Sequence, residues 1–204
     1  MKTVIILAVS TALGALLVTS SYALDRALLV AAPNAESLLP SFGGAGRQFQ
    51  ITAQGGNSIT GWLPADWSDN SDWAAVSATY KKLPEAEAPK PGLTAVRVEL
   101  TKVEEGQLQL AVMKTIDFAK GQRYAVTGWI RSKDGANINV GIRQPGDPYE
   151  FYQQKLLTSE DEWKPFTFEF TMDELRQAFV MFTKPEPGVV DLAGIELVKK
   201  EAAR

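Results

Sequence analysis

The sequence predicts an all-β fold, a two-sheet β-sandwich whose chain follows a jelly-roll path. Apolar and polar residues alternate in short runs along most of the chain, and turns rich in Gly, Pro and Asp separate these runs. Successive side chains of a β-strand point to opposite faces, so each run is expected to form a strand with one buried face. Almost no segment has helical periodicity. Roughly nine or ten short strands separated by turns are typical of sandwiches and barrels.

The clearest runs lie in residues 121–171, where four strands are expected. One face of the first run carries apolar residues and glycine, namely Tyr124, Val126, Gly128 and Ile130. Trp129 and Arg131 fall on its other face. In the next run Ile138, Val140 and Ile142 share one face, and Asn139 and Arg143 share the opposite one. The apolar faces account for folding. The other face, with its mixture of aromatic and polar side chains, is a candidate ligand platform.

The remaining elements are expected in the following order. Short extended pieces lie at 28–30, 37–42 and 49–52, and loops at 61–73 and 83–92. Strands follow at 74–80, 96–100 and 108–112, before the 121–171 segment. The capping-box spacing of Thr171 and Glu174 predicts one short helical turn. Strands at 177–183 and 189–199 complete the chain, which gives a single domain over residues 24–204.

The first residues have the pattern of a secretory signal peptide, predicted over residues 1–23. Lys2 precedes a mostly apolar run at 4–18, and Ser21 and Ala23 supply small side chains for cleavage after Ala23. A retained membrane anchor is the alternative, but the run is shorter than the ~20 residues that span a bilayer. We therefore expect a secreted or periplasmic protein that is free of the membrane and monomeric.

The composition excludes several kinds of chemistry. The formal net charge is −3, which argues against nucleic acid or an anionic membrane as partner. Cysteine and histidine are both absent, so disulfides, thiolate or imidazole metal sites and Ser-His-Asp catalysis are excluded. Only carboxylate or lysine chemistry would remain open to an enzyme, and a carboxylate-only hydrolase would need a pair of acids. The candidates for such a hydrolase, all in turn-like segments, are Asp66, Asp69, Asp147 and Glu150.

Residues 61–73 hold an unusual cluster of three tryptophans interleaved with three aspartates: Trp62, Trp67 and Trp73, and Asp66, Asp69 and Asp72. Two interpretations stay open. The indole rings could fasten a loop to the core, or Trp67 and its neighbours could form an aromatic wall beside a ligand site. Clustered carboxylates also suit calcium. Their spacing is not that of a known calcium loop, so a structural calcium ion is a minor alternative.

The order of three segments resembles carbohydrate-binding modules of families 4 and 9, which are cellulose- and xylan-binding modules with a galactose-binding-like β-sandwich. The segments are LQLAVMKTIDFAKGQRYAVTGWIRS (108–132), YEFYQQKLLTSEDEWKPFTFEFT (149–171) and VVDLAGIELV (189–198). The resemblance implies a non-catalytic module that binds a polysaccharide or oligosaccharide, of β-glucan or xylan type, in a groove on the concave sheet face. SLLPSF (37–42) lacks a Glu of the family pattern, whereas Asp191 matches the family's terminal aspartate. This departure leaves the family's structural calcium site open.

The resemblance also implies which side chains contact the ligand. Carried over by position, they are Trp129, Arg131, Asn139, Arg143, Gln109, Tyr149 and Tyr152, with Trp67 in a flanking wall. Trp and Tyr offer a flat apolar surface with a polar edge, and Asn, Gln and Arg offer paired hydrogen-bonding groups for adjacent hydroxyls. Each has a structural alternative, such as packing of Trp129 against a covering loop. An extracellular domain that binds a protein or cell-surface component is the second hypothesis, and a hydrolase the least favoured.

Overall fold

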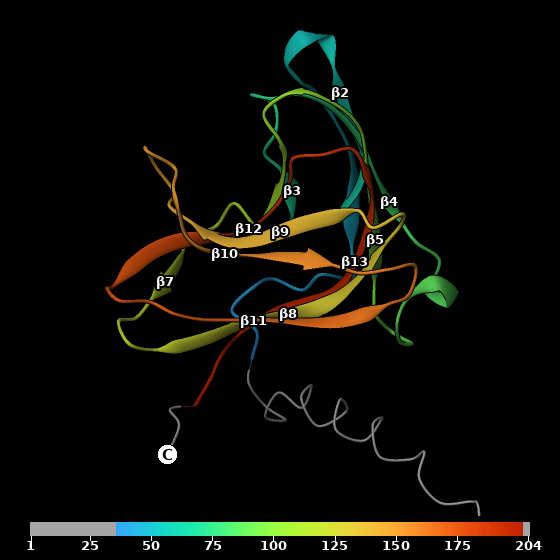
Figure 1. The fold of residues 1–204 in the computed structure, drawn as a ribbon. Helices are drawn as coiled ribbons and strands as arrows, with labels where there is room; N and C mark the ends of the chain where they lie inside the picture. Colours follow the sequence, from blue (N-terminus) through green and yellow to red (C-terminus); the bar gives the residue numbers. More distant parts are fainter. Residues whose placement is uncertain (1–35, 202–204) are drawn as a thin grey trace, which may run out of the picture. The chain divides into compact units, whose positions relative to one another are not determined.

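The computed structural model describes residues 36–201, which fold into two facing β-sheets (Figure 1). The predicted signal peptide and the extended piece at 28–30 lie outside the described residues. The first sheet, sheet A, has the order β1-β2-β4-β5-β13-β8-β11. Its strands are β1 (Gly46–Thr52), β2 (Ser58–Pro64), β4 (Ala75–Lys82), β5 (Ala95–Glu105), β13 (Gly188–Lys199), β8 (Arg123–Ser132) and β11 (Lys164–Thr171).

The second sheet, sheet B, has the order β10-β9-β12-β6-β3, with β7 paired to β12 beside this path. Its strands are β10 (Phe151–Thr158), β9 (Asn137–Arg143), β12 (Arg176–Lys184), β6 (Leu108–Ala111), β3 (Ser68–Asp69) and β7 (Ile116–Phe118). Neighbouring strands are antiparallel except for β2 and β4. The predicted all-β jelly-roll sandwich is confirmed, and the four strands expected in residues 121–171 are β8 to β11.

Two local predictions were wrong. Residues 61–73 do not form one loop, because β2 continues to Pro64 and β3 pairs with β6. The helical turn at 171–174 is absent, because Thr171 ends β11 and the buried Met172 makes a β-bridge to Lys120. The helical turns of the described residues are two short 3₁₀ segments, η1 (Gln54–Gly56) and η2 (Glu85–Glu87).

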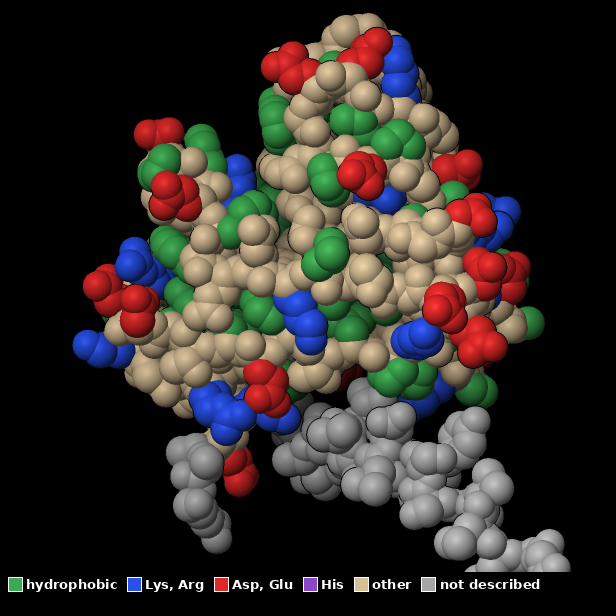
Figure 2. Space-filling model, viewed as in Figure 1, with side chains coloured by type: hydrophobic (Ala, Val, Ile, Leu, Met, Phe, Trp, Pro, Cys, Tyr) green, Lys and Arg blue, Asp and Glu red, His purple; other side chains and the backbone are tan. Residues whose placement is uncertain are grey.

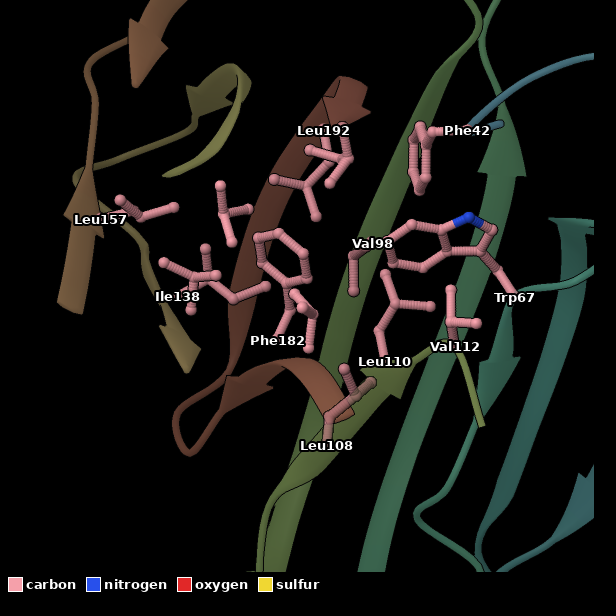
Figure 3. Close-up of a cluster of buried hydrophobic side chains, with 14 of the residues drawn as sticks. Phe42, Trp67, Val98, Leu108, Leu110, Val112, Ile138, Leu157, Phe182 and Leu192 are labelled. Carbon is pink, nitrogen blue, oxygen red and sulfur yellow. The ribbon is translucent and has the colours of Figure 1, made fainter. Parts of the chain in front are cut away.

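The core lies between the two sheets, where the apolar faces of the alternating strands meet (Figure 3). Trp67 is completely buried there and contacts Phe42 edge to face, with ring centroids 4.7 Å apart. Phe182 of β12 lies on its other side, at 6.3 Å. Trp67 therefore joins the segment before β1, the turn before β3 and a central strand of sheet B. The interpretation of the tryptophan cluster as an anchor is correct for Trp67, and its proposed place in a ligand wall was wrong.

One edge of the sandwich is closed by side chains rather than by backbone pairing. Gln153 Nε2 of β10 donates to the carbonyl oxygen of Thr171 (2.8 Å), and Lys155 Nζ donates to that of Thr167 (2.9 Å). These bonds bring the edge strand of sheet B against β11, the edge strand of sheet A. On the outer face next to this edge, Gln154, Leu156 and Thr158 of β10 are exposed, whereas Asn139 and Arg143 of β9 are partly buried.

Candidate functional site

The outer face of sheet B carries a row of polar side chains across three neighbouring strands. Gln109 of β6 is paired with Thr183 of β12, and Thr183 is paired with Asn139 of β9. Residues directly opposite each other in paired strands share a face, and strands lie about 4.8 Å apart, so the row crosses roughly 10 Å. The predicted candidates Gln109 and Asn139 therefore lie on one face of the sheet, where Gln109 and Thr183 are buried and Asn139 is partly exposed.

A mostly buried apolar patch, in which only Phe151 is partly exposed, lies next to this polar row. Met181 of β12 is paired with Gly141 of β9, and the ring of Phe151 lies over Gly141. A Cβ atom at position 141 would come within 2.5 Å of Phe151 Cδ1. The absence of a side chain at Gly141 thus gives the ring its seat on the sheet. Gln154 of β10, which is paired with Gly141, is exposed beside it.

The loop 144–150 rises from the same face and is held by its own hydrogen bonds. The amide of Gln144 donates to the carbonyl of Glu150 (2.9 Å), and the amide of Tyr149 donates to that of Gly146 (2.8 Å). Tyr149 has a φ of 62°, a left-handed conformation that is costly for a bulky residue. Its ring is 51% exposed, and the Arg143 guanidinium carbon lies 4.8 Å from the ring centroid. Tyr149 and Arg143 form one unit.

A hollow separates this loop from the β1–β2 hairpin, which projects on the other side of the sheet B face (Figures 1 and 2). Asn70 and Trp73 follow β3 at the Gln109 end of the polar row. Asn70 Nδ2 donates to Gln109 Oε1 (2.9 Å), and Trp73 Nε1 donates to the carbonyl of Asn70 (2.8 Å). Trp73 is 43% exposed. We refer to this face, from Tyr149 to Asn70, as the sheet B groove.

Behind the groove, a buried polar network connects the two sheets. The Tyr80 hydroxyl of β4 donates to Asp69 of β3 (2.6 Å), and the Ser71 amide donates to the same carboxylate (2.8 Å). The backbone amide of Gln109 in turn donates to Ser71 Oγ (2.7 Å). Burial raises the pKa of Asp69 to about 6, although the hydrogen bonds from Tyr80 and Ser71 act in the opposite direction. The network fixes the strand that carries Gln109.

The structure brings together four of the eight predicted ligand residues: Asn139, Arg143, Gln109 and Tyr149. Gln109 is only 2% exposed, so its side chain orients Asn70 rather than presenting itself to a ligand. Phe151 and Gln154, on the accessible β10, were missed. The sequence signal for Phe151 is weak, because it depends on the pairing that seats its ring over Gly141.

Trp129 and Arg131 are not in the groove, and their placement beside Asn139 and Arg143 was wrong. They lie on β8, which pairs with β13 and β11 in sheet A, whereas β9 belongs to sheet B. Trp129 packs against the buried Leu83, Ala95 and Ala193. Lys90 Nζ lies 4.9 Å from its ring centroid. The alternative interpretation, packing against a covering loop, describes Trp129.

Tyr152 is also turned away from the groove. It lies at a β-bulge between Phe151 and Gln153, and it packs against the main core. The guanidinium carbon of Arg176 lies 4.7 Å from its ring centroid. The bulge explains why the alternation that predicts facing elsewhere fails here. Tyr152 therefore packs the start of β10, next to Phe151, against the core.

The carboxylates considered for calcium are engaged by other side chains or lie exposed and apart from one another. Asp191 is 1% exposed and makes ion pairs with Arg97 (2.8 Å) and Arg131 (2.7 Å). Both carboxylate oxygens are occupied by guanidinium groups. Asp69 is bound to Tyr80, and Asp66 and Asp72 are exposed. Within residues 36–201, no three His, Cys, Asp or Glu side chains gather closely enough to hold a metal ion.

A cavity of about 220 Å³ lies apart from the polar row, and it is lined by Leu38, Pro40, Val112, Lys114, Thr115, Ile116, Asp117 and Lys199. Its charged lining residues are Lys114, Asp117 and Lys199. No helix formed by residues 36–201 has the length and apolar character that a bilayer span requires.

Several of the solved structures that are similar to this chain are carbohydrate-binding modules. One, titled "CBM4 structure and function", is 15% identical, with 66% of this chain and 86% of that chain covered and a TM-score of 0.48. A family 11 module from Clostridium thermocellum, in complex with a beta-1,3-1,4-mixed-linked tetrasaccharide, is 12% identical over 76% of this chain and 97% of that chain (TM-score 0.47). A family 61 module in complex with beta-1,4-galactotriose is 16% identical over 66% and 88% (TM-score 0.42). None of the curated proteins compared with the chain matches it.

Residues 91–188 match the family model described as "Carbohydrate binding domain", which covers families 4 and 9. The matched segment contains the groove residues Gln109, Asn139, Arg143, Tyr149 and Phe151. This match supports a role in carbohydrate binding. Residues 91–188, just under half of the chain, therefore correspond to a carbohydrate binding domain of families 4 and 9.

Proposed function

We propose that the protein is a secreted, non-catalytic module that binds a polysaccharide chain of the β-glucan or xylan type in the sheet B groove. The observation that carries this proposal is the sheet B groove itself. One accessible face combines the rings of Tyr149 and Phe151 with the amides of Asn139 and Gln154. Secretion is proposed from the signal-peptide pattern of residues 1–23.

The chemistry of this face suits a pyranose chain. A sugar ring has an apolar C–H face, which packs on an aromatic ring, and a rim of hydroxyls, which needs both donors and acceptors. A side-chain amide offers two donors and an acceptor, so Asn139 and Gln154 can each bond to adjacent hydroxyls. The open hollow between the loop 144–150 and the β1–β2 hairpin suits a chain that extends beyond the site (Figure 2).

The rigidity of the site also supports the proposal. Tyr149 is held by the hydrogen bonds of its loop and by Arg143, and Phe151 is held over Gly141. A side chain that is already fixed loses little conformational entropy when a ligand arrives. The left-handed backbone of Tyr149 is a local cost of about 1–3 kcal/mol, which is of the kind found at ligand sites.

Isothermal titration calorimetry with xylo-oligosaccharides and mixed-linkage β-glucan oligosaccharides tests the proposal. Tyr149→Ala and Asn139→Ala should each weaken binding about tenfold, equivalent to about 1.4 kcal/mol. Thr127→Ala, which changes a polar residue on the outer face of sheet A, is the matched control and should bind as the unmodified protein does. Trp129→Ala should also retain binding wherever it folds.

Circular dichroism of each variant separates loss of binding from loss of fold. Loss of affinity on Trp129→Ala with normal affinity on Tyr149→Ala would move the site to sheet A. If no soluble oligosaccharide or insoluble polysaccharide binds the unmodified protein, the proposed function is wrong.

A further inference from the structure

Arg143 is set apart from most arginines of the described residues by the absence of an acidic partner. Residues 36–201 contain six arginines. Four of them, Arg97, Arg123, Arg131 and Arg176, make ion pairs with carboxylates at 2.7–3.1 Å. Arg47 donates to Ser68. Among the described residues, Arg143 makes no ion pair and no side-chain hydrogen bond, and its charge is left uncompensated.

The surroundings of Arg143 make this unusual. The side chain is half-buried, and burial lowers the pKa of its guanidinium. Asp147 and Glu150 belong to the adjoining loop, yet neither carboxylate takes part in an ion pair within the described residues. A guanidinium stays charged in spite of such a shift. Partly removing a charge from water costs free energy unless an opposite charge or hydrogen bonds offset it. The fold carries this cost without an internal counter-ion.

The position of Arg143 suits it to meet a ligand. It lies on the groove face of β9, opposite Phe151 of β10 and Phe179 of β12. Tyr149 supports the guanidinium through the stacked contact at 4.8 Å. The N–H donors lie in the guanidinium plane and form a fork that matches the two oxygens of a carboxylate. An anion that enters the groove beside Tyr149 and Phe151 would meet this fork.

We propose that the polysaccharide recognised in the groove carries a uronic acid, and that Arg143 binds its carboxylate. This inference rests on the proposed function and adds the chemical class of the ligand. The formal net charge of −3 opposes a densely charged polyanion. A single uncompensated arginine in the described groove matches one carboxylate. The expected ligand is a largely neutral chain with isolated uronic acid branches, rather than a polyuronate.

The decisive measurement compares three oligosaccharides of one length by calorimetry: a neutral xylo-oligosaccharide, the same chain with one glucuronic acid branch, and that branched chain with its carboxyl group reduced to the alcohol. The acidic branched ligand should bind at least tenfold more tightly than the other two. Raising the salt concentration from 20 to 300 mM should weaken only this preference, because salt screens exposed ion pairs, with a Debye length of about 10 Å at 0.1 M.

Matched variants assign the preference to Arg143. Arg143→Gln should bind the three ligands with equal affinity, even where loss of the contact with Tyr149 lowers the affinity for all of them. Arg143→Lys should keep part of the preference, because it keeps the charge but loses the fork. Arg123→Gln removes the same charge from an exposed position at the start of β8 in sheet A and should leave the preference unchanged. An Arg143→Gln protein that retains the preference would overturn the assignment.

The outcomes for the two proposals are distinct. Equal affinity of the unmodified protein for the acidic, reduced and neutral ligands would overturn this inference and leave the proposed function standing. Tighter binding of an oligogalacturonate than of the branched chain would also overturn it, in favour of a polyuronate ligand. Absence of binding to all of them would remove the proposed function and this inference together.

Discussion

Asp69 is a carboxyl group that the fold keeps from water, and it gives the protein a specific pH dependence. Because the folded state raises its pKa from 3.8 to about 6, the folded state holds this proton more tightly than the unfolded chain. Its contribution to the free energy of unfolding therefore falls as pH rises from about 4 to 6 and is constant above. The difference across this window is of the order of 2–3 kcal/mol.

We expect Asp69→Asn to remove this component. An amide keeps a hydrogen-bond acceptor for Tyr80 and cannot ionise. Urea denaturation at pH 4.5, 6 and 8 should show that the substitution stabilises the protein at pH 8 relative to its effect at pH 4.5. Tyr80→Phe removes the partner hydroxyl and leaves the Asp69 carboxylate, so it should destabilise the protein most at pH 8. An identical pH profile for Asp69→Asn and the unmodified protein would contradict the burial of an ionisable Asp69.

At the scale of the residue, the sequence predicts chemical types better than it predicts roles. Trp67 and Trp129 are the same kind of residue in two positions that both suited a ligand surface. Trp67 is buried because Phe42 and Phe182 enclose it, and these residues are distant in sequence. Trp129 is covered because residues 83–95 return over β8. The residues that cover Trp67 and Trp129 cannot be identified from the alternation within a single strand.

At the scale of the element, β9 and β10 build the groove by a close fit between a glycine and a ring. Gly141→Ala would place a methyl group within 2.5 Å of Phe151 Cδ1, so the ring has to leave its seat. We expect oligosaccharide affinity to fall several-fold, while the free energy of unfolding falls by about 1–2 kcal/mol, the usual cost of overpacking. Calorimetry and urea denaturation measure the two effects.

The control for this substitution is Gly146→Ala, in the neighbouring loop, where an added Cβ meets no atom within 4 Å. It should leave both affinity and stability nearly unchanged. Unchanged binding by a folded Gly141→Ala protein would show that the position of Phe151 is not needed for the ligand.

The same two strands explain which part of the site was predictable. Alternation assigns Asn139 and Arg143 to the face opposite Ile138 and Val140, and this is confirmed. It does not say which sheet a strand joins. The short turn after β8 carries the chain from sheet A to sheet B, so Trp129 and Asn139 occupy different surfaces although they are near in sequence. The fold class needs only the number and spacing of strands, whereas the site needs the path between them.

At the scale of the whole molecule, packing and ion pairs between strands hold the described domain together. The chain has no cysteine, and the Asp191 carboxylate is bound by Arg97 of β5 and Arg131 of β8, its two neighbouring strands. We expect EDTA and dithiothreitol each to change the melting temperature by no more than about 1 °C, because the chain has no cysteine to reduce and its described residues hold no cluster of metal-ligating side chains. Loss of 1 kcal/mol of stability would lower the melting temperature by roughly 2–4 °C. Differential scanning calorimetry checks this. A fall of several degrees with EDTA, reversed by calcium, would show a metal site.

Asp191→Asn tests how much the ion pairs with Arg97 and Arg131 contribute to stability. It should destabilise the protein by about 2–3 kcal/mol, because two guanidinium groups lose their common charged partner in a largely buried position. Lys102→Ala, which breaks the exposed pair with Glu104, should change stability by less than about 0.5 kcal/mol.

The ends of the described chain and the groove lie on opposite sides of the sandwich. The segment that begins at Glu36 reaches the body beneath β13, where the amide of Leu38 donates to the carbonyl of Leu197 (2.7 Å), and β13 is also the last strand before Glu201. The loop 144–150 and the β1–β2 hairpin project the other way (Figure 1). A sensor chip that holds the domain by either of these ends would therefore present the groove to the flowing solution, whereas random coupling through lysines would not fix its orientation.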